Sequence, residues 1–552
     1  MFVSSFYHHH GVKYACISPG ARNSPLIYAF TKSKITCYSH IDERSSAFFA
    51  LGLAKSTRSP VVIISTSGTA TANFYPAVIE ASLSRVPIMI LTADRPEALV
   101  GTGANQTINQ QNLYGNYVRY FKDVGLPEDC VDSLEGILYQ SFQHVMGIKL
   151  QLPPGPVHLN FPFSEPIIGE NNIKNINFSN FSNFSFKSFS NNVPIQSTIP
   201  ALPKSAKPLI VVGPMEGSFH QEEIIRLGEK IQAPIFADPL SQIRYGYNHP
   251  HMLALYDHFL KIIDIKPDLI IRFGRKPTSK YLCQLLDSCK MKTYLIDDWN
   301  KFNDDCPNFI QSSIKIFCQD QIKMIDWEGK LEWKEYFLSI EKKIDLIIQS
   351  ESYSEASIAR VCHKSLEDGD QFIIGNSMPI RDVDMFTSNT DKNIRTFGNR
   401  GASGIDGVTS TALGISASNS NLRSLLLIGD LSLYHDMNGL LASQYKTNLT
   451  IVVINNQGGG IFSFLSIANM DIETFEKYWT TDTGLDFEKV SELYNCTYYK
   501  VNDLKNLQCS IQDSFQKEGV KIIEARTNIK DNIEAHRSIE KEVQKVLTSN
   551  QF

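Results

Sequence analysis

Short runs of apolar and β-branched residues alternate along the chain with longer stretches in which apolar residues recur at helical spacing. Continuous apolar runs of this length, separated by helical stretches, are typical of parallel strands that are buried on both faces. The strands predicted in this way are 61–66, 87–94, 208–214, 234–239, 268–274, 292–298, 371–377, 424–430, 449–456 and 520–527.

The alternation predicts an α/β fold built from three doubly wound parallel-sheet domains. Two segments interrupt the pattern. Residues 170–205 are rich in Asn, Ser and Phe and then in Pro, which is typical of a linker between domains. A second boundary is expected near 345–355. The expected organisation is a first domain at 1–168, a linker at 169–205, a central domain at 206–345 and a last domain at 353–552.

The composition is that of a globular protein, with 42% apolar and 20% charged residues in a chain of 552. The net charge of −5 argues against nucleic acid or an anionic membrane surface as the main partner. The sequence contains no run of 18 apolar residues, so we expect no membrane span. The ten cysteines are scattered and form no CxxC pair, which indicates reduced thiols in a cytoplasmic protein.

Two neighbouring predicted strands end in polar residues with oxygen-bearing side chains. The run 424–430 ends in Gly429 and Asp430, and the run 449–456 ends in Asn456, with Gly458 close behind. Because ligands bind at the carboxyl ends of strands in an open parallel sheet, Asp430 and Asn456 are expected side by side. Their hard oxygens suit Mg²⁺, and the glycines allow a diphosphate to approach closely. The alternative is two ordinary strand-to-loop turns, which favour Asp, Asn and Gly.

An acidic residue opens a largely apolar helix predicted at 40–55. Glu43 lies in its first turn, where an acid is usually a partner of the helix dipole. The strand at 61–66 then runs into the small residues of SGTATAN, 67–73, which let a flat ring approach the backbone. The sequence therefore leaves two explanations for Glu43 open, a functional role and an interaction with the helix dipole.

These two regions together resemble the thiamine-diphosphate-dependent enzymes. The resemblance implies that the first domain binds the pyrimidine ring and the last binds the diphosphate with Mg²⁺ or Mn²⁺. It implies that Glu43 is catalytic and hydrogen-bonds the pyrimidine ring, and that Ile405 bends the cofactor. The implied metal ligands are Asp430, Asn456 and the carbonyl of Gly458, and the other implied cofactor-binding residues are Gly68, Gly429 and Ile461.

A narrower resemblance rests on motifs that recur in order through the first and last domains. They look like the family of 2-succinyl-5-enolpyruvyl-6-hydroxy-3-cyclohexene-1-carboxylate synthases, and TADRPEAL and NRGASGIDG are more specific than the cofactor motifs. The match is poor across 170–265. The segments that carry the resemblance are 16–26, 40–55, 66–81, 91–115, 155–166, 375–382, 399–407, 429–440 and 455–462.

The substrates that this family implies, 2-oxoglutarate and isochorismate, are both rich in carboxylates. Guanidinium is the natural two-pronged partner of a carboxylate, and arginines stand inside the glycine-rich loops of this chain. For any one arginine, a structural ion pair is the alternative. The implied substrate-binding residues are Arg22, Arg95, Gln106, Lys280, Ser377, Arg381, Arg400, Phe462 and Leu465.

The implied activity is decarboxylation of 2-oxoglutarate and 1,4-addition of the succinyl-semialdehyde unit to isochorismate, a transferase reaction of menaquinone biosynthesis. The resemblance also implies a homodimer or dimer of dimers with active sites at the subunit interface. One alternative is an acetolactate-synthase-like enzyme or a simple 2-oxo-acid decarboxylase, which would not need Arg95, Arg381 and Arg400 together. The other is an inactive regulatory relative, against which the intact Glu43 and Asp430 argue.

Overall fold

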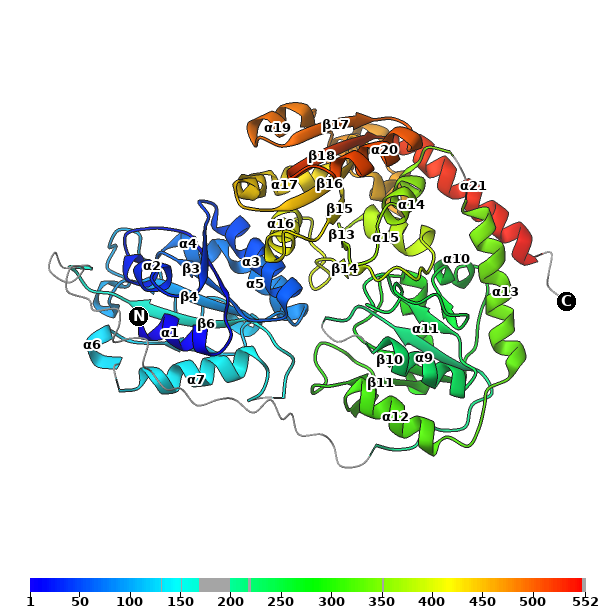
Figure 1. Ribbon diagram of the computed structural model, residues 1–552, viewed down its shortest axis with the longest axis horizontal. Helices are drawn as coiled ribbons and strands as arrows, with labels where there is room; N and C mark the ends of the chain where they lie inside the picture. The colour runs from blue at the N-terminus through cyan, green and yellow to red at the C-terminus, as the bar shows by residue number, and fades with distance from the viewer. Residues whose placement is uncertain (131, 150, 168–198, 217–219, 350–351, 549–552) are drawn as a thin grey trace. The chain divides into compact units, whose positions relative to one another are not determined.

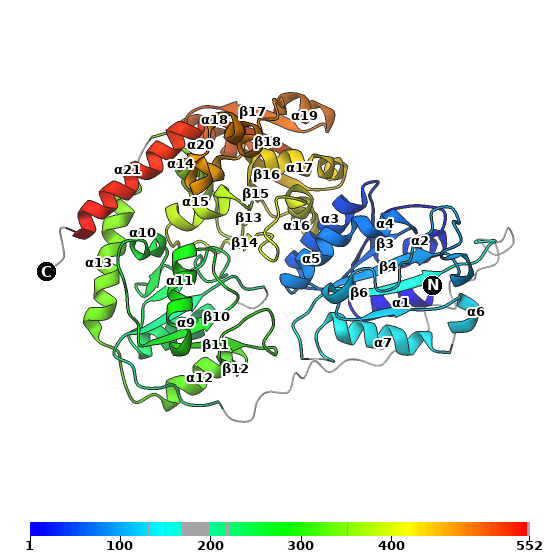
Figure 2. The same ribbon diagram turned by 180° about the vertical axis from the view of Figure 1, so that it is seen from behind.

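The chain forms two compact units that together hold three six-stranded sheets. The computed structural model describes residues 1–130, 132–149, 151–167, 199–216, 220–349 and 352–548. Every pairing between these strands is parallel, and Figures 1 and 2 show helices packed against each sheet. The predicted α/β fold with three doubly wound parallel sheets is confirmed.

The two units do not follow the order of the chain. Unit 1 comprises Met1–Pro194, Asn399–Asn419 and Asp436–Tyr445, and unit 2 comprises Ile195–Gly398, Ser420–His435 and Lys446–Phe552. Most of the predicted linker at 169–205 lies outside the described residues, since the description resumes at 199. The domain boundaries expected from the sequence stay predictions.

The sheet of unit 1 has the strand order β2-β1-β3-β4-β6-β5. Its strands are β1 (Tyr14–Ile17), β2 (Thr36–Ser39), β3 (Val61–Ser65), β4 (Ile88–Asp94), β5 (Phe121–Asp123) and β6 (Val157–Pro162). Its helices are α1 (Phe2–His9), α2 (Ser24–Thr31), α3 (Glu43–Thr57), α4 (Thr69–Asn73), α5 (Tyr75–Leu83), η1 (Glu97–Leu99), η2 (Gly115–Tyr117), α6 (Pro127–Cys130), α7 (Leu134–Val145), α16 (Val408–Ser418) and η5 (Met437–Gln444). Apolar side chains of α1, α2 and α7 form one core with alternate residues of β1, β3, β4 and β6.

Helices α3 and α16 touch through their backbones. A Cβ atom added to Gly52 of α3 would lie 2.0 Å from the carbonyl oxygen of Thr411. A Cβ atom added to Gly414 of α16 would likewise lie 2.0 Å from the carbonyl oxygen of Phe49. Only glycine fits at these two positions, because the obstructing atoms belong to backbone and cannot rotate away. The helix that begins at Glu43 is thereby fixed to α16.

We expect the substitution Gly414→Ala to lower the free energy of unfolding by at least about 1–3 kcal/mol, the usual cost of overpacking. Urea denaturation measures this change. The matched control is Gly136→Ala on α7, where an added Cβ meets no atom within 4 Å. That change should stabilise the protein by about 0.4–1 kcal/mol, because alanine loses less backbone entropy on folding. Equal effects of the two substitutions would contradict the backbone contact of α3 with α16.

Unit 2 holds the other two sheets. The first has the order β12-β11-β10-β7-β8-β9 and the second the order β14-β13-β15-β16-β18-β17. The first comprises β7 (Pro208–Val212), β8 (Ile235–Ala237), β9 (Met252–Leu253), β10 (Leu269–Phe273), β11 (Thr293–Asp297) and β12 (Asn308–Gln311), with α9 (Gln221–Lys230), α10 (Tyr256–Leu260), α11 (Lys280–Ser288), η4 (Lys290–Lys292), α12 (Ile314–Met324) and α13 (Leu331–Ile347). Helices α9 and α12 contribute to one core against this sheet, and α10, α11 and α13 contribute to another.

The last sheet carries the motif Gly429-Asp430. Its strands are β13 (Gln371–Ile374), β14 (Arg395–Phe397), β15 (Ser424–Gly429), β16 (Asn448–Asn455), β17 (Thr497–Val501) and β18 (Gly519–Arg526). The remaining helices are α14 (Glu355–Lys364), α15 (Met378–Phe386), α17 (Asp430–His435), η6 (Gly460–Phe464), η7 (Ser466–Asn469), α18 (Ile472–Phe475), η8 (Glu476–Thr480), α19 (Phe487–Leu493), α20 (Leu504–Ser514) and α21 (Ile529–Thr548). Helices α14, α15 and α20 share a core with these strands. Parallel pairing of β15 with β16 aligns Gly429 with Ile454, so both strands end at one edge.

The structure bears on two further expectations from the composition, one on the state of the cysteines and one on membrane-spanning helices. All ten cysteines carry free thiols, as their scattered positions predicted. Within the described part of the chain, none of the helices has the length and apolar character needed to cross a membrane.

Candidate active site

The oxygen atoms of Asp430 and Asn456 meet at the edge where β15 and β16 end. Asp430 Oδ2 accepts a hydrogen bond from the backbone N–H of Gly458 at 2.9 Å, and Asn456 Oδ1 accepts from the same N–H at 3.2 Å. Asp430 Oδ1 accepts from the N–H of Leu431 at 2.7 Å. The side-by-side placement expected from the sequence is therefore present.

The environment of Asp430 suits a cation. Burial raises the pKa of its carboxyl group to about 7, although hydrogen bonds from backbone N–H groups oppose that rise. A bound divalent cation would favour the charged carboxylate at this buried position. The donors are a carboxylate and an amide oxygen, which fit Mg²⁺. Among the described residues, no group of three or more His, Cys, Asp and Glu side chains is placed to hold a metal ion.

Glu355, a residue that the sequence did not single out, fixes the orientation of Asn456. It is the first residue of α14 and only 1% exposed, and its Oε1 accepts from Asn456 Nδ2 at 2.8 Å. The hydroxyl of Thr527 donates to the same oxygen at 3.2 Å. Because Glu355 engages the amide nitrogen, the amide oxygen of Asn456 is directed toward Gly458. An acid in the first turn of a helix is too common to have suggested this contact from the sequence.

The two glycines at this edge, Gly429 and Gly458, differ in how closely other atoms surround them. Gly458 has φ +149°, and an added Cβ would lie 2.1 Å from the carbonyl oxygen of Thr480. Gly458 is therefore required by both conformation and space. A Cβ added to Gly429 would meet no atom within 4 Å. Packing within the protein therefore does not explain Gly429, whereas close approach of a ligand would.

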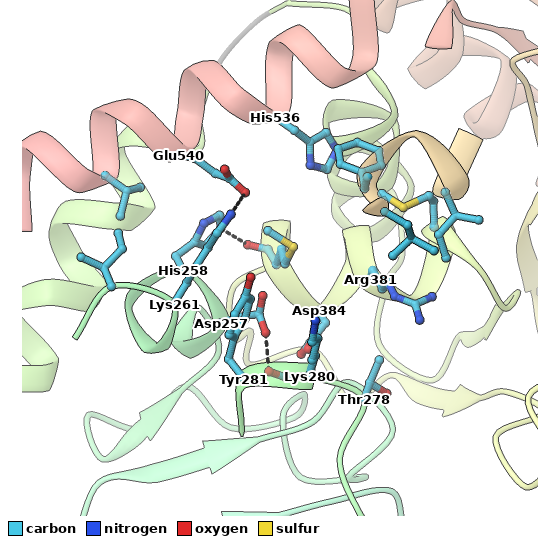
Figure 3. Close-up of a pocket in the computed structure, with 18 of the residues that line it drawn as sticks. Asp257, His258, Lys261, Thr278, Lys280, Tyr281, Arg381, Asp384, His536 and Glu540 are labelled. Carbon is cyan, nitrogen blue, oxygen red and sulfur yellow. Dashed lines mark hydrogen bonds and ion pairs between the residues drawn. The ribbon is translucent and has the colours of Figure 1, made fainter. Parts of the chain in front are cut away.

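A pocket of about 670 Å³ in unit 2 brings together four residues expected at the active site: Lys280, Arg381, Ile461 and Leu465. Figure 3 shows Arg381 on α15 and Lys280 at the start of α11. Arg381 also donates to the carbonyl oxygen of Ser377, the residue before α15, whose φ is +69°. Ser377 is thus linked to this pocket through Arg381. Phe462 lies in η6, next to Ile461.

The acidic groups of this pocket already have partners. Asp384 pairs with Arg244 at 2.9 Å, Asp257 accepts from the hydroxyl of Ser279, and Glu540 pairs with Lys261. Among the residues that the structure describes, no acidic side chain forms an ion pair with Lys280 or Arg381. The pocket therefore presents two cationic groups to an anionic ligand, beside the carboxyl group of Asp257, whose pKa is raised by burial.

A second group of expected residues lies in unit 1. Arg95 Nη1 donates to the carbonyl oxygen of Gln106 at 2.8 Å and to the hydroxyl of Ser67. Gln106 Nε2 donates to the carbonyl oxygen of Ser67 at 3.1 Å, and Gly68, with φ +84°, follows directly. Burial lowers the pKa of Arg95, and the positive charge of Arg22 lowers it further. The structure thus gathers Arg22, Arg95, Gln106 and Gly68 around one loop.

Arg22 also has a structural role. Its guanidinium pairs with Glu165 at 2.8 Å and donates to the carbonyl oxygen of Phe163 at 2.8 Å. The side chain of Glu165 is 67% exposed, so this ion pair is weak by itself. The structural ion pair that was the alternative for any one arginine is therefore present at Arg22.

Glu43 is the first residue of α3, as expected, and it is half-buried. The preceding Asp42 caps the helix, since its side chain accepts from the N–H of Ser45 at 3.2 Å. Arg400 and Ile405 lie in the segment that leads into α16, and Ile405 is 37% exposed. These three residues belong to unit 1, whereas Asp430 and the pocket around Arg381 belong to unit 2.

Three family models match the chain in succession. They are the N-terminal TPP binding domain of thiamine pyrophosphate enzymes over residues 2–113, the middle domain over 189–374, and the C-terminal TPP binding domain over 386–525. The crystal structure of benzoylformate decarboxylase from Polynucleobacter necessarius superposes with a TM-score of 0.70, covering 96% of this chain and 98% of that one. At 17% identity, that likeness concerns the fold alone.

Curated relatives show to which family of thiamine-diphosphate-dependent enzymes the chain belongs. The 2-succinyl-5-enolpyruvyl-6-hydroxy-3-cyclohexene-1-carboxylate synthase of Oceanobacillus iheyensis is 38% identical, with 96% of this chain and 94% of the relative covered. The enzyme of the same name from Listeria innocua is also 38% identical over the same shares of both chains. The chain therefore belongs to the 2-succinyl-5-enolpyruvyl-6-hydroxy-3-cyclohexene-1-carboxylate synthases, a family of thiamine-diphosphate-dependent enzymes.

Proposed function

We propose that this chain decarboxylates 2-oxoglutarate and adds the resulting four-carbon unit to isochorismate in a 1,4-addition, a step of menaquinone biosynthesis. The observation that carries the proposal is the pocket with two cationic groups, Lys280 and Arg381, beside the apolar Ile461 and Leu465. Both substrates carry carboxylates, and both must present a carbon atom to a site that excludes water. A pocket lined by both cations and apolar side chains meets both needs.

Bound thiamine diphosphate supplies the electron sink for decarboxylation. We infer that Asp430, Asn456 and the carbonyl of Gly458 hold the Mg²⁺ or Mn²⁺ that accompanies its diphosphate. Glu355 supports this assignment because it keeps the amide oxygen of Asn456 directed toward Gly458. Glu43 would hydrogen-bond the pyrimidine ring and exchange a proton with it, since a carboxylic acid donates a proton and its carboxylate accepts one.

The arginines in the loops would bind the carboxylates of the substrates. A guanidinium forms two parallel hydrogen bonds with a carboxylate, and this geometry selects carboxylates over other anions. Arg381 and Lys280 would act in unit 2, and Arg22, Arg95 and Arg400, with Gln106 beside them, in unit 1. Ile461, Phe462 and Leu465 would form the apolar wall over the reacting carbons. Ser377 would orient Arg381 through its carbonyl oxygen.

We also propose that the chain works as a homodimer or a dimer of dimers, with active sites at the subunit interface. Large apolar side chains beside expected cofactor residues support this proposal. Ile41 is 79% exposed two residues before Glu43, and Tyr434 is 50% exposed on the helix that begins at Asp430. A partner subunit would remove these side chains from water, and burial of apolar surface is the main driving force of most protein association.

Arg381→Ala should weaken use of 2-oxoglutarate and isochorismate roughly tenfold to hundredfold, since a charged hydrogen bond contributes about 1.5–3 kcal/mol. Affinity for thiamine diphosphate should stay unchanged. Steady-state kinetics measures the first effect and calorimetric titration the second. Arg381→Lys should recover only part of the loss, because a point charge cannot form the two-pronged bond.

The control for this prediction is Arg226→Ala on α9, a side chain that is 64% exposed and paired with Glu222. It should leave both measurements unchanged. Loss of cofactor binding in Arg381→Ala with normal use of substrate would contradict the proposed role of Arg381.

The experiment that separates this proposal from an acetolactate-synthase-like activity compares two 2-oxo acids as the substrate that is decarboxylated. Release of CO₂ is measured from 2-oxoglutarate and from pyruvate at equal concentrations, in the presence of isochorismate, the cofactor and Mg²⁺. We expect 2-oxoglutarate to be preferred, because its second carboxylate can pair with a cation of the pocket. Pyruvate has a methyl group in place of that carboxylate arm and cannot form this pair. Preference for pyruvate would overturn the proposal.

A further inference from the structure

Glu80 is a buried carboxylate in unit 1 with an unusual set of partners. It lies on α5 and is only 2% exposed. Its Oε1 accepts from the backbone N–H of Gly401 at 2.9 Å, and its Oε2 accepts from the N–H of Ala402 at 2.7 Å. The hydroxyl of Ser84 also donates to Oε1, and Lys55 Nζ lies 3.7 Å from that oxygen.

A carboxylate is costly to bury unless it is paired and hydrogen-bonded. Glu80 meets that condition, but two of its donors belong to a segment more than 300 residues away in the sequence. The side chain of Lys55, which is 1% exposed, supplies the compensating charge from α3. The position of residues 401 and 402 is therefore tied to the position of one carboxylate.

The contact between this segment and α5 is close as well as polar. A Cβ atom added to Gly401 would lie 2.7 Å from the carbonyl oxygen of Glu80 and 2.8 Å from the hydroxyl of Ser84. The backbone at Gly401 thus rests directly on the end of α5. The segment 399–407 then leads into α16, which the backbone contact at Gly414 fixes to α3.

We propose that Glu80, with Lys55 as its counter-ion, is a positioning residue for the segment 399–407. This segment carries Arg400 directly before the anchored amides and Ile405 shortly after them. The inference rests on the proposed function, which assigns Arg400 to the substrate and Ile405 to the cofactor. Glu80 accepts hydrogen bonds from the backbone of this segment, from which both side chains project.

Two variants separate anchoring from the cost of an unpaired buried charge. Glu80→Gln keeps the length of the side chain but leaves one acceptor oxygen for two backbone N–H groups, and it takes the carboxylate of Glu80 away from the charge of Lys55. The double variant Lys55→Met with Glu80→Gln removes that charge as well, so it should fold more stably than the single variant. Glu128→Gln, an exposed acid on α6, is the control.

The first measurement is amide hydrogen exchange of the segment 399–407 in the full-length enzyme. Both Glu80 variants should lose roughly tenfold or more of the protection at residues 401 and 402, because glutamine offers a neutral acceptor to one of the two N–H groups and none to the other. The second measurement is steady-state kinetics with saturating thiamine diphosphate. KM for the carboxylate substrates should rise roughly tenfold, whereas a merely structural role would lower the active fraction, and so kcat, at unchanged KM.

Faster exchange at residues 401 and 402 together with a raised KM in the double variant would support the proposal. Wild-type exchange in that variant would overturn the anchoring, and faster exchange with wild-type KM would overturn the positioning role. The exchange measurement requires no turnover. A wild-type enzyme that forms no product would therefore contradict the proposed function, and the anchoring would still be decided by exchange.

Discussion

Replacing Glu43 with glutamine is expected to lower kcat by roughly 10²–10⁴ while thiamine diphosphate stays bound. Glutamine keeps the size of the side chain and can still hydrogen-bond, but it cannot exchange a proton. Asp42 caps α3 directly before Glu43, and the backbone contact with α16 holds the helix further along, so the fold should tolerate the change. The measurements are kcat, calorimetric titration of the cofactor, and NMR exchange of the thiazolium C2 proton.

The control for Glu43 addresses the alternative that it is only a partner of the helix dipole. Glu135 occupies the first turn of α7 and is exposed. Glu135→Gln should cost about 0.3–1 kcal/mol of stability and no activity. If Glu43→Gln behaves in the same way, with C2 proton exchange at the wild-type rate, then Glu43 is a helix-end acid and the catalytic assignment is wrong.

Asp430→Ala is expected to abolish Mg²⁺-dependent binding of thiamine diphosphate. Loss of a residue that merely supports a metal ligand typically costs 10–100-fold in metal affinity, so loss of a ligand should exceed about 100-fold. The fold should survive, because burial already raises the pKa of Asp430 to about 7 and its carboxylate forms no ion pair with any side chain that the structure describes. Calorimetric titration with cofactor and Mg²⁺ measures the loss, and circular dichroism checks the fold.

A matched control for Asp430 is Asp482→Ala. Asp482 is exposed, and its charge is among the influences that raise the pKa of Asp430. This control should keep cofactor binding. Full Mg²⁺-dependent binding by Asp430→Ala would remove Asp430 from the metal site.

Most of the central strands could be predicted from the sequence, because continuous apolar runs mark strands buried on both faces, but β1 was missed. β3, β4, β15 and β16 are examples of the predicted strands, and each lies where such a run predicted it. β6 was missed although all six of its residues are buried. His158 and Asn160 interrupt its apolar run, and Thr92 Oγ1 lies 2.7 Å from atoms of both side chains. A buried polar network of this kind leaves no apolar pattern.

Short strands at sheet edges were missed for a different reason. β2, at 36–39, is largely half-exposed or exposed, and β14, at 395–397, contains only three residues. Such segments have neither the length nor the apolar character that distinguishes a strand from a loop.

Site residues on neighbouring strands could be predicted to meet, and residues joined by tertiary contacts could not. Asp430 and Asn456 follow adjacent parallel strands, so their proximity follows from sheet geometry. Glu355 and Glu80 give no such signal, because each is an acid on a helix whose partners lie elsewhere in the sequence. Motif resemblance suggested Arg381 and Lys280, but only the folded chain places them in one pocket.

The reaction assigned to this enzyme joins 2-oxoglutarate to isochorismate. The direct test is mass spectrometry of the products formed by the wild-type protein with thiamine diphosphate and Mg²⁺, from 2-oxoglutarate with and without isochorismate. With both substrates, we predict one product whose mass equals their sum minus CO₂, formed in step with CO₂ release, and little release without isochorismate. Release of CO₂ together with free succinic semialdehyde, at the same rate whether or not isochorismate is present, would contradict this assignment and indicate a simple 2-oxo-acid decarboxylase.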